Sequence, residues 1–297
     1  GYGVDSLFFS KRFPSTVYVE PNASLLNIVQ HNHQQLQAGD ITYHPTTAEE
    51  FIEKNTSVFD VIYIDPSRRD VANKKVFKLT DCVPDVVALQ PALFSQCRQL
   101  LIKTSPLLDL QQGIQSLRGV KSVFVVAVDN ECKEVLFLCE PNFNGEPSIH
   151  AINLQQGRMT QLSFLASAER ETESNFSAPL TYLYEPDAAI CKAGAFKTIG
   201  ARYNLHKLHR HTHLYTAQHA DLNFPGRVFE IIALVKPDPQ SLKSYISDGK
   251  ANIFTRNYPL SVAQLRQRTQ LTDGGDVYVI GFSGVSKKYV AVARRCV

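Results

Sequence analysis

The chain has 297 residues, of which 44% are hydrophobic and 20% are charged, and its formal net charge is +3. This length allows two or three domains, and the composition is ordinary for a globular protein. No apolar run approaches the roughly 18 residues that a membrane-spanning helix requires, so the sequence argues against a membrane partner.

The distribution of charge and the cysteine content narrow the possible classes of protein further. Residues 1–150 contain 13 Lys and Arg against 17 Asp and Glu, whereas residues 151–297 contain 18 against 11. The acidic half is typical of an enzyme core, and the basic half faces either an anionic polymer or solvent. The six cysteines form no C-x-x-C pair. We therefore expect reduced thiols in a cytoplasmic protein rather than zinc ligands or disulfides.

The amino-terminal residues 1–5 form the end of a glycine-rich turn. A helix is predicted at 6–13 and a strand at 16–20, which ends in Glu20. Glycines let the backbone approach a ligand closely, and an acid at the tip of the next strand accepts hydrogen bonds from ribose hydroxyls. This spacing favours a nucleoside-containing cofactor over a helix-entry turn beside an exposed acid. The chain begins within this motif, and we interpret it as a fragment that lacks a first strand and binds its cofactor weakly.

The clearest buried strand follows. Helices are predicted at 22–37 and 48–54, with a strand at 41–44 between them. The run of β-branched and aromatic residues at 59–64 then predicts a buried strand of a parallel sheet, ending in an Asp-Pro turn. Ligands of open α/β sheets lie just beyond the carboxyl ends of the strands, so residues 65–69 are expected on the ligand-binding rim. The alternative is a surface turn in which the aspartate caps a helix.

The first half of the chain closes in an antiparallel pair. A helix at 84–99, a strand at 100–104 and a helix at 108–117 lead to strands at 122–128 and 134–139. The loop between the last two strands is so short that it forces a hairpin. The pattern predicts an α/β fold in which a doubly wound sheet ends in a reversed edge pair.

Less regular sequence follows at 141–180, where turn residues are frequent. Within it, 149–154 and 159–164 are predicted to pair as a hairpin, and 169–177 reads as a polar linker.

A doubly wound sheet that closes with an antiparallel hairpin resembles the class I S-adenosylmethionine-dependent methyltransferases. The pair Gly1-x-Gly3 resembles their first motif without its leading strand, and Glu20 resembles their ribose-binding acid. The resemblance implies a Rossmann-like methyltransferase sheet with S-adenosylmethionine as cofactor. It also implies that Gly1, Gly3 and Asp5 shape the methionine and ribose end of the cofactor site, while Glu20 holds the ribose.

The turn after the buried strand carries the second part of this resemblance. Asp65-Pro66-Ser67-Arg68 is similar to the Asp/Asn-Pro-Pro-x motif of many members that methylate nucleic-acid bases, except that Ser67 replaces the second proline. The resemblance implies that Asp65 orients the target base and that the Pro66 carbonyl is a second acceptor. Arg68 and Arg69 contact either the flanking phosphates of the substrate or acids on the domain surface.

Three histidines in the basic half, His209, His211 and His213, have the spacing i, i+2 and i+4, which places them on one face of a predicted strand. Such a face binds phosphates, binds a metal or is solvated. A metal-dependent hydrolase centred on these residues is therefore an alternative function, although H-x-H hydrolase sites usually include a nearby Asp. The nearest one beyond them is Asp221.

The remaining residues predict a compact α+β module. Its strands are predicted at 228–235, 251–259, 277–282 and 288–293, and its helices at 241–247 and 261–267. Residues 250–253, 256–259 and 274–276 resemble the THUMP-like carboxy-terminal domain found with bacterial methyltransferases, and 185–226 resembles the small ferredoxin-like segment that accompanies it. The expected domains are a methyltransferase domain without its first strand at 1–145, a connecting segment at 146–180, the ferredoxin-like segment at 181–226 and the THUMP-like domain at 227–297.

The resemblance implies an S-adenosylmethionine-dependent methyltransferase that acts on a base of structured RNA, either tRNA or rRNA, without a metal. A non-catalytic RNA-binding protein with a methyltransferase fold is the alternative. It is permitted by the altered proline motif and by the lack of an acid at 46–48, where the family often contacts the adenine amino group. The oligomeric state is left open.

Overall fold

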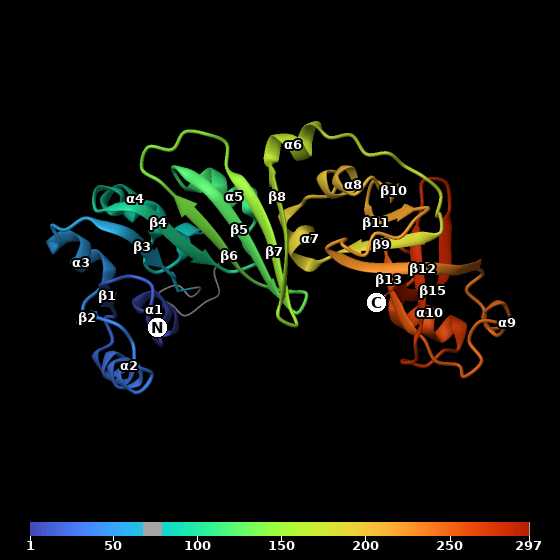
Figure 1. The fold of residues 1–297 in the computed structure, drawn as a ribbon, viewed down its shortest axis with the longest axis horizontal. Coiled ribbons are helices and arrows are strands. Elements are labelled where there is room, and N and C mark those ends of the chain that lie inside the picture. The colour runs from blue at the N-terminus through green and yellow to red at the C-terminus, as the bar shows by residue number, and fades with distance from the viewer. Residues whose placement is uncertain (68–78, 297) are drawn as a thin grey trace. The chain divides into compact units, whose positions relative to one another are not determined.

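The computed structural model describes residues 1–67 and 79–296 and divides into two compact units (Figure 1). The first unit comprises residues 1–121 and 137–144, and the second comprises residues 122–136 and 145–297. Within the described residues, no helix is long and apolar enough to cross a membrane.

The first unit alternates helices and strands, as the sequence predicts. Its helices are α1 (Val4–Ser10), α2 (Ala23–Gln35), α3 (Ala48–Lys54), the short 3-10 helix η1 (Leu79–Asp81), α4 (Val86–Ser95) and α5 (Leu110–Ser116). Its strands are β1 (Thr16–Val19), β2 (Ile41–His44), β3 (Phe59–Ile64) and β4 (Cys97–Thr104), followed by β5 (Val120–Val128) and β6 (Glu131–Cys139), which both units share. Side-chain caps fix several starts: Asn22 accepts a hydrogen bond from the Leu25 N–H in α2, and Asp109 accepts one from the Gln112 N–H in α5.

The strands of residues 1–165 form two sheets. β1 and β2 pair in parallel, with Thr16 opposite Ile41. A six-stranded sheet also includes β7 (Ser148–Gln155) and β8 (Arg158–Leu165). Its order is β3-β4-β6-β5-β7-β8, and β3 and β4 are parallel. In the part of the chain that the structure describes, β1 does not pair with β3, and each is an edge strand of its own sheet. The single doubly wound sheet predicted from the sequence is therefore divided into two sheets. The parallel β3–β4 pair places both carboxyl ends at one rim.

The helix predicted at 84–99 is too long, because α4 ends at Ser95 and β4 begins at Cys97. Pairing with β3 places Phe59 opposite Cys97. Cys97 and Leu100 are both buried, and burial of the side chains along β4 favours the strand. The local sequence pattern gives no information on the pairing with β3. The predicted boundary between helix and strand was therefore too late in the sequence.

The hairpin predicted at 149–154 and 159–164 is confirmed as β7 (Ser148–Gln155) and β8 (Arg158–Leu165). Its turn residues Gln156 and Gly157 both have positive φ angles, as a two-residue hairpin turn of the I′ type requires. β7 also pairs in parallel with β5. Residues of the expected connecting segment therefore extend the sheet.

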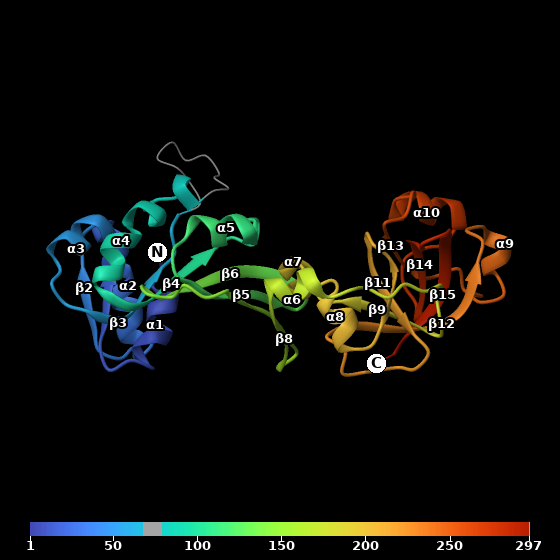
Figure 2. The same ribbon diagram turned by 90° about the horizontal axis from the view of Figure 1, so that it is seen from above.

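The second unit contains a seven-stranded sheet with the order β10-β11-β9-β12-β15-β14-β13. Its further elements are α6 (Ala166–Glu171), β9 (Tyr182–Pro186), α7 (Ala188–Ala193), α8 (Thr198–Arg202), β10 (His206–His209), β11 (Thr212–Ala217), β12 (Gly226–Val235), α9 (Pro239–Leu242), β13 (Asn252–Arg256), α10 (Val262–Thr269), β14 (Val277–Ser283) and β15 (Lys288–Cys296). The helices α9 and α10 lie beside the β13–β15 strands (Figure 2), where Leu242 and Leu265 pack with Val279 and Val292. The pairing of β9 with β12 makes one sheet of residues 182–296.

The start of α1 depends on Gly3. Its φ angle is 71°, and a Cβ atom there would lie 2.5 Å from Val29 Cγ1 and 2.8 Å from His33 Nε2. Gly3→Ala is expected to lower the free energy of unfolding by roughly 2–4 kcal/mol, since backbone strain and overpacking add. Gly157→Ala is the matched control: its φ is 74° with no atom within 4 Å, so strain alone should cost about 1 kcal/mol. Urea unfolding of both variants measures this difference, and equal losses would contradict the packing explanation.

Candidate functional site

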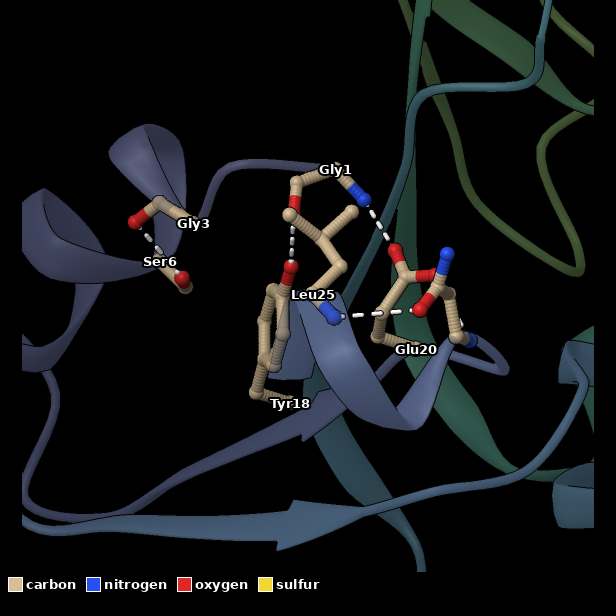
Figure 3. Close-up of polar contacts among 7 residues, drawn as sticks. Gly1, Gly3, Ser6, Tyr18, Glu20 and Leu25 are labelled. Carbon is tan, nitrogen blue, oxygen red and sulfur yellow. Dashed lines mark hydrogen bonds and ion pairs between the residues drawn. The ribbon is translucent and has the colours of Figure 1, made fainter. Parts of the chain in front are cut away.

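Glu20 follows β1 directly and lies beside the glycine turn (Figure 3). This residue is only 8% exposed. Its Oε2 atom accepts a hydrogen bond from the Gly1 nitrogen, and its Oε1 atom accepts one from the Asn22 N–H at 3.0 Å. The Tyr18 hydroxyl donates to the Gly1 carbonyl at 2.6 Å. These contacts fasten Gly1 to the tip of β1.

The two glycines of the turn have different surroundings. Gly3 caps α1 in the left-handed conformation, and the His33 ring bonds to its carbonyl oxygen at 2.8 Å, so the fold itself accounts for a glycine here. A Cβ atom at Gly1 would meet nothing within 4 Å. The space beside Gly3 is filled by α2.

Asp5, in the first turn of α1, belongs to a polar network at the rim of β3 and β4. The Tyr63 hydroxyl donates to Asp5 Oδ2 at 2.6 Å, and the Lys103 ammonium donates to the same oxygen at 2.8 Å. The Lys103 ammonium also lies 2.9 Å from Asp65 Oδ2. One cation thus links Asp5 of α1 to Asp65 of the loop after β3.

This network fixes the charge of its members. Burial raises the pKa of Asp5, but the hydrogen bonds from Lys103 and Tyr63 outweigh burial and lower this pKa below its ordinary value of 3.8. Burial lowers the pKa of Lys103, but its bonds to Asp5, Tyr63 and Asp65 outweigh burial and raise this pKa. Burial and the bond to Asp5 raise the pKa of Tyr63. At neutral pH the network therefore contains an ammonium, an ionised Asp5 and a neutral phenol.

Lys103 is the member that the sequence analysis missed. It lies near the end of β4, and β3 pairs with β4 so that Ile64 lies opposite Ile102. Asp65 and Lys103 are the next step along the same register. The sequence does contain a signal for this pair. The predicted strands end in an acid and a cation, and the carboxyl ends of parallel strands share one edge.

The amino-terminal segment connects the two strand tips. Its first residue, Gly1, contacts Glu20 after β1, and Asp5 contacts Lys103 of β4, which binds Asp65 after β3. Five residues thus span from the acid of one tip to the ion pair of the other. The roles expected for these residues toward a cofactor stay predictions.

The remaining residues of the Asp-Pro turn are described only in part. Pro66 is buried, and the Ser67 N–H donates to the Val83 carbonyl at 2.8 Å. Arg68 and Arg69, expected to contact substrate phosphates, lie outside the described residues.

The three histidines do not share one strand face, so that prediction was wrong. His209 ends β10, His211 lies in the tight turn and His213 belongs to β11. The His213 ring stacks on Phe196 with 3.6 Å between centroids, and burial with the nearby charge of Lys207 lowers the pKa of His213 to about 4. Residues 1–67 and 79–296 contain no group of three His, Cys, Asp or Glu arranged to hold a metal ion. This geometry gives no support to the hydrolase alternative.

A second charged cluster lies in the second unit, where Glu185 of β9 pairs with two arginines. Its side chain is 7% exposed, and Oε2 accepts a hydrogen bond from Arg227 Nε at 2.6 Å while the Arg256 guanidinium pairs with Oε1. Both guanidinium groups lie over the Phe254 ring, with 4.8 and 5.2 Å to its centroid. Two cations against one acid leave net positive charge on this part of the sheet.

Two family models match parts of the second unit, and a solved structure matches the whole chain. A ferredoxin-like domain family matches residues 182–225, and a THUMP domain-like family matches residues 226–295. A crystal structure described as "putative methyltransferase from Porphyromonas gingivalis W83" is 32% identical to this chain, with a TM-score of 0.89. The match covers 100% of this chain and 75% of that one. No curated protein matches the chain significantly.

The fold is that of a Rossmann-like methyltransferase sheet followed by ferredoxin-like and THUMP-like domains, and the fold class expected from the sequence is confirmed. The chain belongs to the family of the Porphyromonas gingivalis protein, the methyltransferases with a THUMP-like carboxy-terminal domain. The resemblance found in the sequence is confirmed with it.

Tyr63→Phe tests the charge state of the rim. Asp5 has a lowered pKa in the folded protein, so its bonds stabilise the fold above about pH 4 and lose this effect as the pH falls through the folded pKa. The variant should lose about 1 kcal/mol of unfolding free energy at pH 7, a small value because the Asp5 side chain is 45% exposed. Urea unfolding should show a smaller loss at pH 3.

Tyr2→Phe, which changes an exposed phenol of the same unit, should behave as the wild type at both pH values. A Tyr63→Phe loss that is the same at pH 3 and pH 7 would show that Asp5 ionisation does not contribute.

Proposed function

We propose that this protein transfers the methyl group of S-adenosylmethionine to a base of structured RNA, either tRNA or rRNA. The observation that supports this most is the contact between the segment after the glycine turn and the neighbouring strand tips, through Asp5, Lys103 and Asp65. Ligands of open α/β sheets bind at such a rim. Membership of a methyltransferase family supplies the reaction class.

The residues around Gly1 fit the cofactor in kind. A nearly buried carboxylate at the tip of β1 lies beside the glycine turn, and Glu20 is the acceptor expected for ribose hydroxyls. Its bond from the Asn22 N–H holds the carboxylate in one orientation. When bound, S-adenosylmethionine supplies an electrophilic methyl group, so the chain contributes chiefly positioning.

Asp65 is the residue proposed to receive the target base. Its side chain is 46% exposed, although Lys103 holds one of its oxygens. A carboxylate that is anchored on one side and open on the other accepts a hydrogen bond from an N–H of the base and orients its nucleophile. The Pro66 carbonyl is the proposed second acceptor.

RNA is the proposed substrate because of the second unit. A base inside a duplex is unreachable, so the enzyme needs an unpaired or flipped-out base and contacts that hold the surrounding backbone. The THUMP-like domain and the Glu185–Arg227–Arg256 cluster support this, since guanidinium groups bind phosphates and stack on bases. The excess of basic residues in 151–297 gives this part of the chain a positive charge, which favours binding to the phosphates of RNA.

Calorimetric titration with S-adenosylmethionine tests the cofactor assignment. The wild-type chain should bind it, and Glu20→Gln should bind at least about tenfold more weakly, because hydrogen bonds to a charged acceptor are lost. Glu53→Gln, on the exposed face of α3, is the control and should leave the affinity unchanged. Asp65→Asn should bind the cofactor within about threefold of wild type, since it is assigned to the target.

Mass spectrometry of tRNA and rRNA nucleosides from cells lacking the gene tests the target. One methylated nucleoside should disappear, return with the wild-type gene and stay absent with Asp65→Asn. RNA binding without measurable binding of S-adenosylmethionine would instead support the non-catalytic alternative.

A further inference from the structure

Lys103 lies beneath the two carboxylates that it binds. Its side chain is 19% exposed, whereas those of Asp5 and Asp65 are 45% and 46% exposed. The ammonium therefore forms the inner end of the network, and the carboxylates form its solvent-facing side. Both acceptor oxygens lie within 2.9 Å of the same nitrogen, so the two acids are close neighbours.

Two carboxylates of the chain bind this ammonium. An ammonium has three N–H donors. The Lys103 group bonds to Asp5 and Asp65, and the Tyr63 ring centroid lies 5.7 Å from its nitrogen. An ammonium with two acidic partners is a poor proton acceptor. General-base catalysis by Lys103 is therefore disfavoured.

We propose that Lys103 is a positioning residue for methyl transfer: its ammonium holds the Asp5 carboxylate of the donor site and the Asp65 carboxylate of the target site in one fixed arrangement. This inference rests on the proposed function, which assigns Asp5 to the methyl donor and Asp65 to the base. The residue thus acts through two others and contacts neither ligand.

The physical need for such a residue follows from the charges. Two carboxylates this close repel each other, and each would turn away or take up a proton without a cation between them. Tyr63 donates only to Asp5, so it does not replace Lys103 at Asp65. In-line methyl transfer tolerates little displacement of donor or acceptor, and a shift of about 1 Å costs on the order of a hundredfold in rate.

Lys103→Met and Lys103→Arg in the whole chain test this inference. In Lys103→Met the carboxyl ¹³C resonance of Asp5 should titrate at higher pH than in the wild type, because its bond to the ammonium is lost. The affinity for S-adenosylmethionine should fall about tenfold, because Asp5 is no longer held in place. Lys103→Arg should restore both properties to within about threefold, since a guanidinium offers two parallel donors to carboxylates. Rescue by arginine separates the role of the charge from general damage to the fold.

Lys121→Met is the matched control, because Lys121 pairs with Glu140 on the same unit, with 2.8 Å between Nζ and Oε1. It should leave the Asp5 titration and the cofactor affinity unchanged. An unchanged Asp5 titration in Lys103→Met, or unchanged affinity in a chain that binds the cofactor, would overturn the inference. A wild-type chain that does not bind S-adenosylmethionine would contradict the proposed function instead, and the Asp5 titration would still decide whether Lys103 controls that carboxylate.

Discussion

One ammonium group between two carboxylates organises the rim of the first unit. Parallel pairing of β3 with β4 sets Asp65 and Lys103 side by side, and the first turn of α1 adds Asp5 from a distant part of the sequence. Because the three groups come from separate elements, their ion pairs tie α1 to the sheet. The same contacts leave both carboxylates facing solvent at the rim where the proposed site lies.

The second unit contains a similar arrangement with the signs reversed. Buried Glu185 holds two arginines, and the β9–β12 pairing connects the ferredoxin-like segment to the THUMP-like domain at the same place. In both units a central charge is shielded, and its partners of opposite sign face outward. Anionic partners at the first rim suit a cationic methyl donor, and cationic partners on the second unit suit phosphates.

Elements with a strong local pattern were predictable from the sequence. The strand Phe59–Ile64 and the helix Ala48–Lys54 have the predicted boundaries, because a continuous apolar run and a Thr47 cap determine them locally. The start of β4 was not predictable, since its pairing with β3 decides it. The histidine spacing misled because a tight turn interrupts the supposed strand at His211. The ion pair of Lys103 with Asp65 depends on the register between β3 and β4, which the local pattern does not give.

The proposed function requires that the tips carrying Glu20 and Asp65 surround one nucleoside-bearing methyl donor. The most direct measurement is NMR of the chain during titration with S-adenosylhomocysteine, the donor without its methyl group. We predict that resonances of Gly1, Glu20, Asp65 and Lys103 shift together with one dissociation constant, while those of the seven-stranded sheet stay in place. Shifts confined to one tip, or to the second unit, would contradict it.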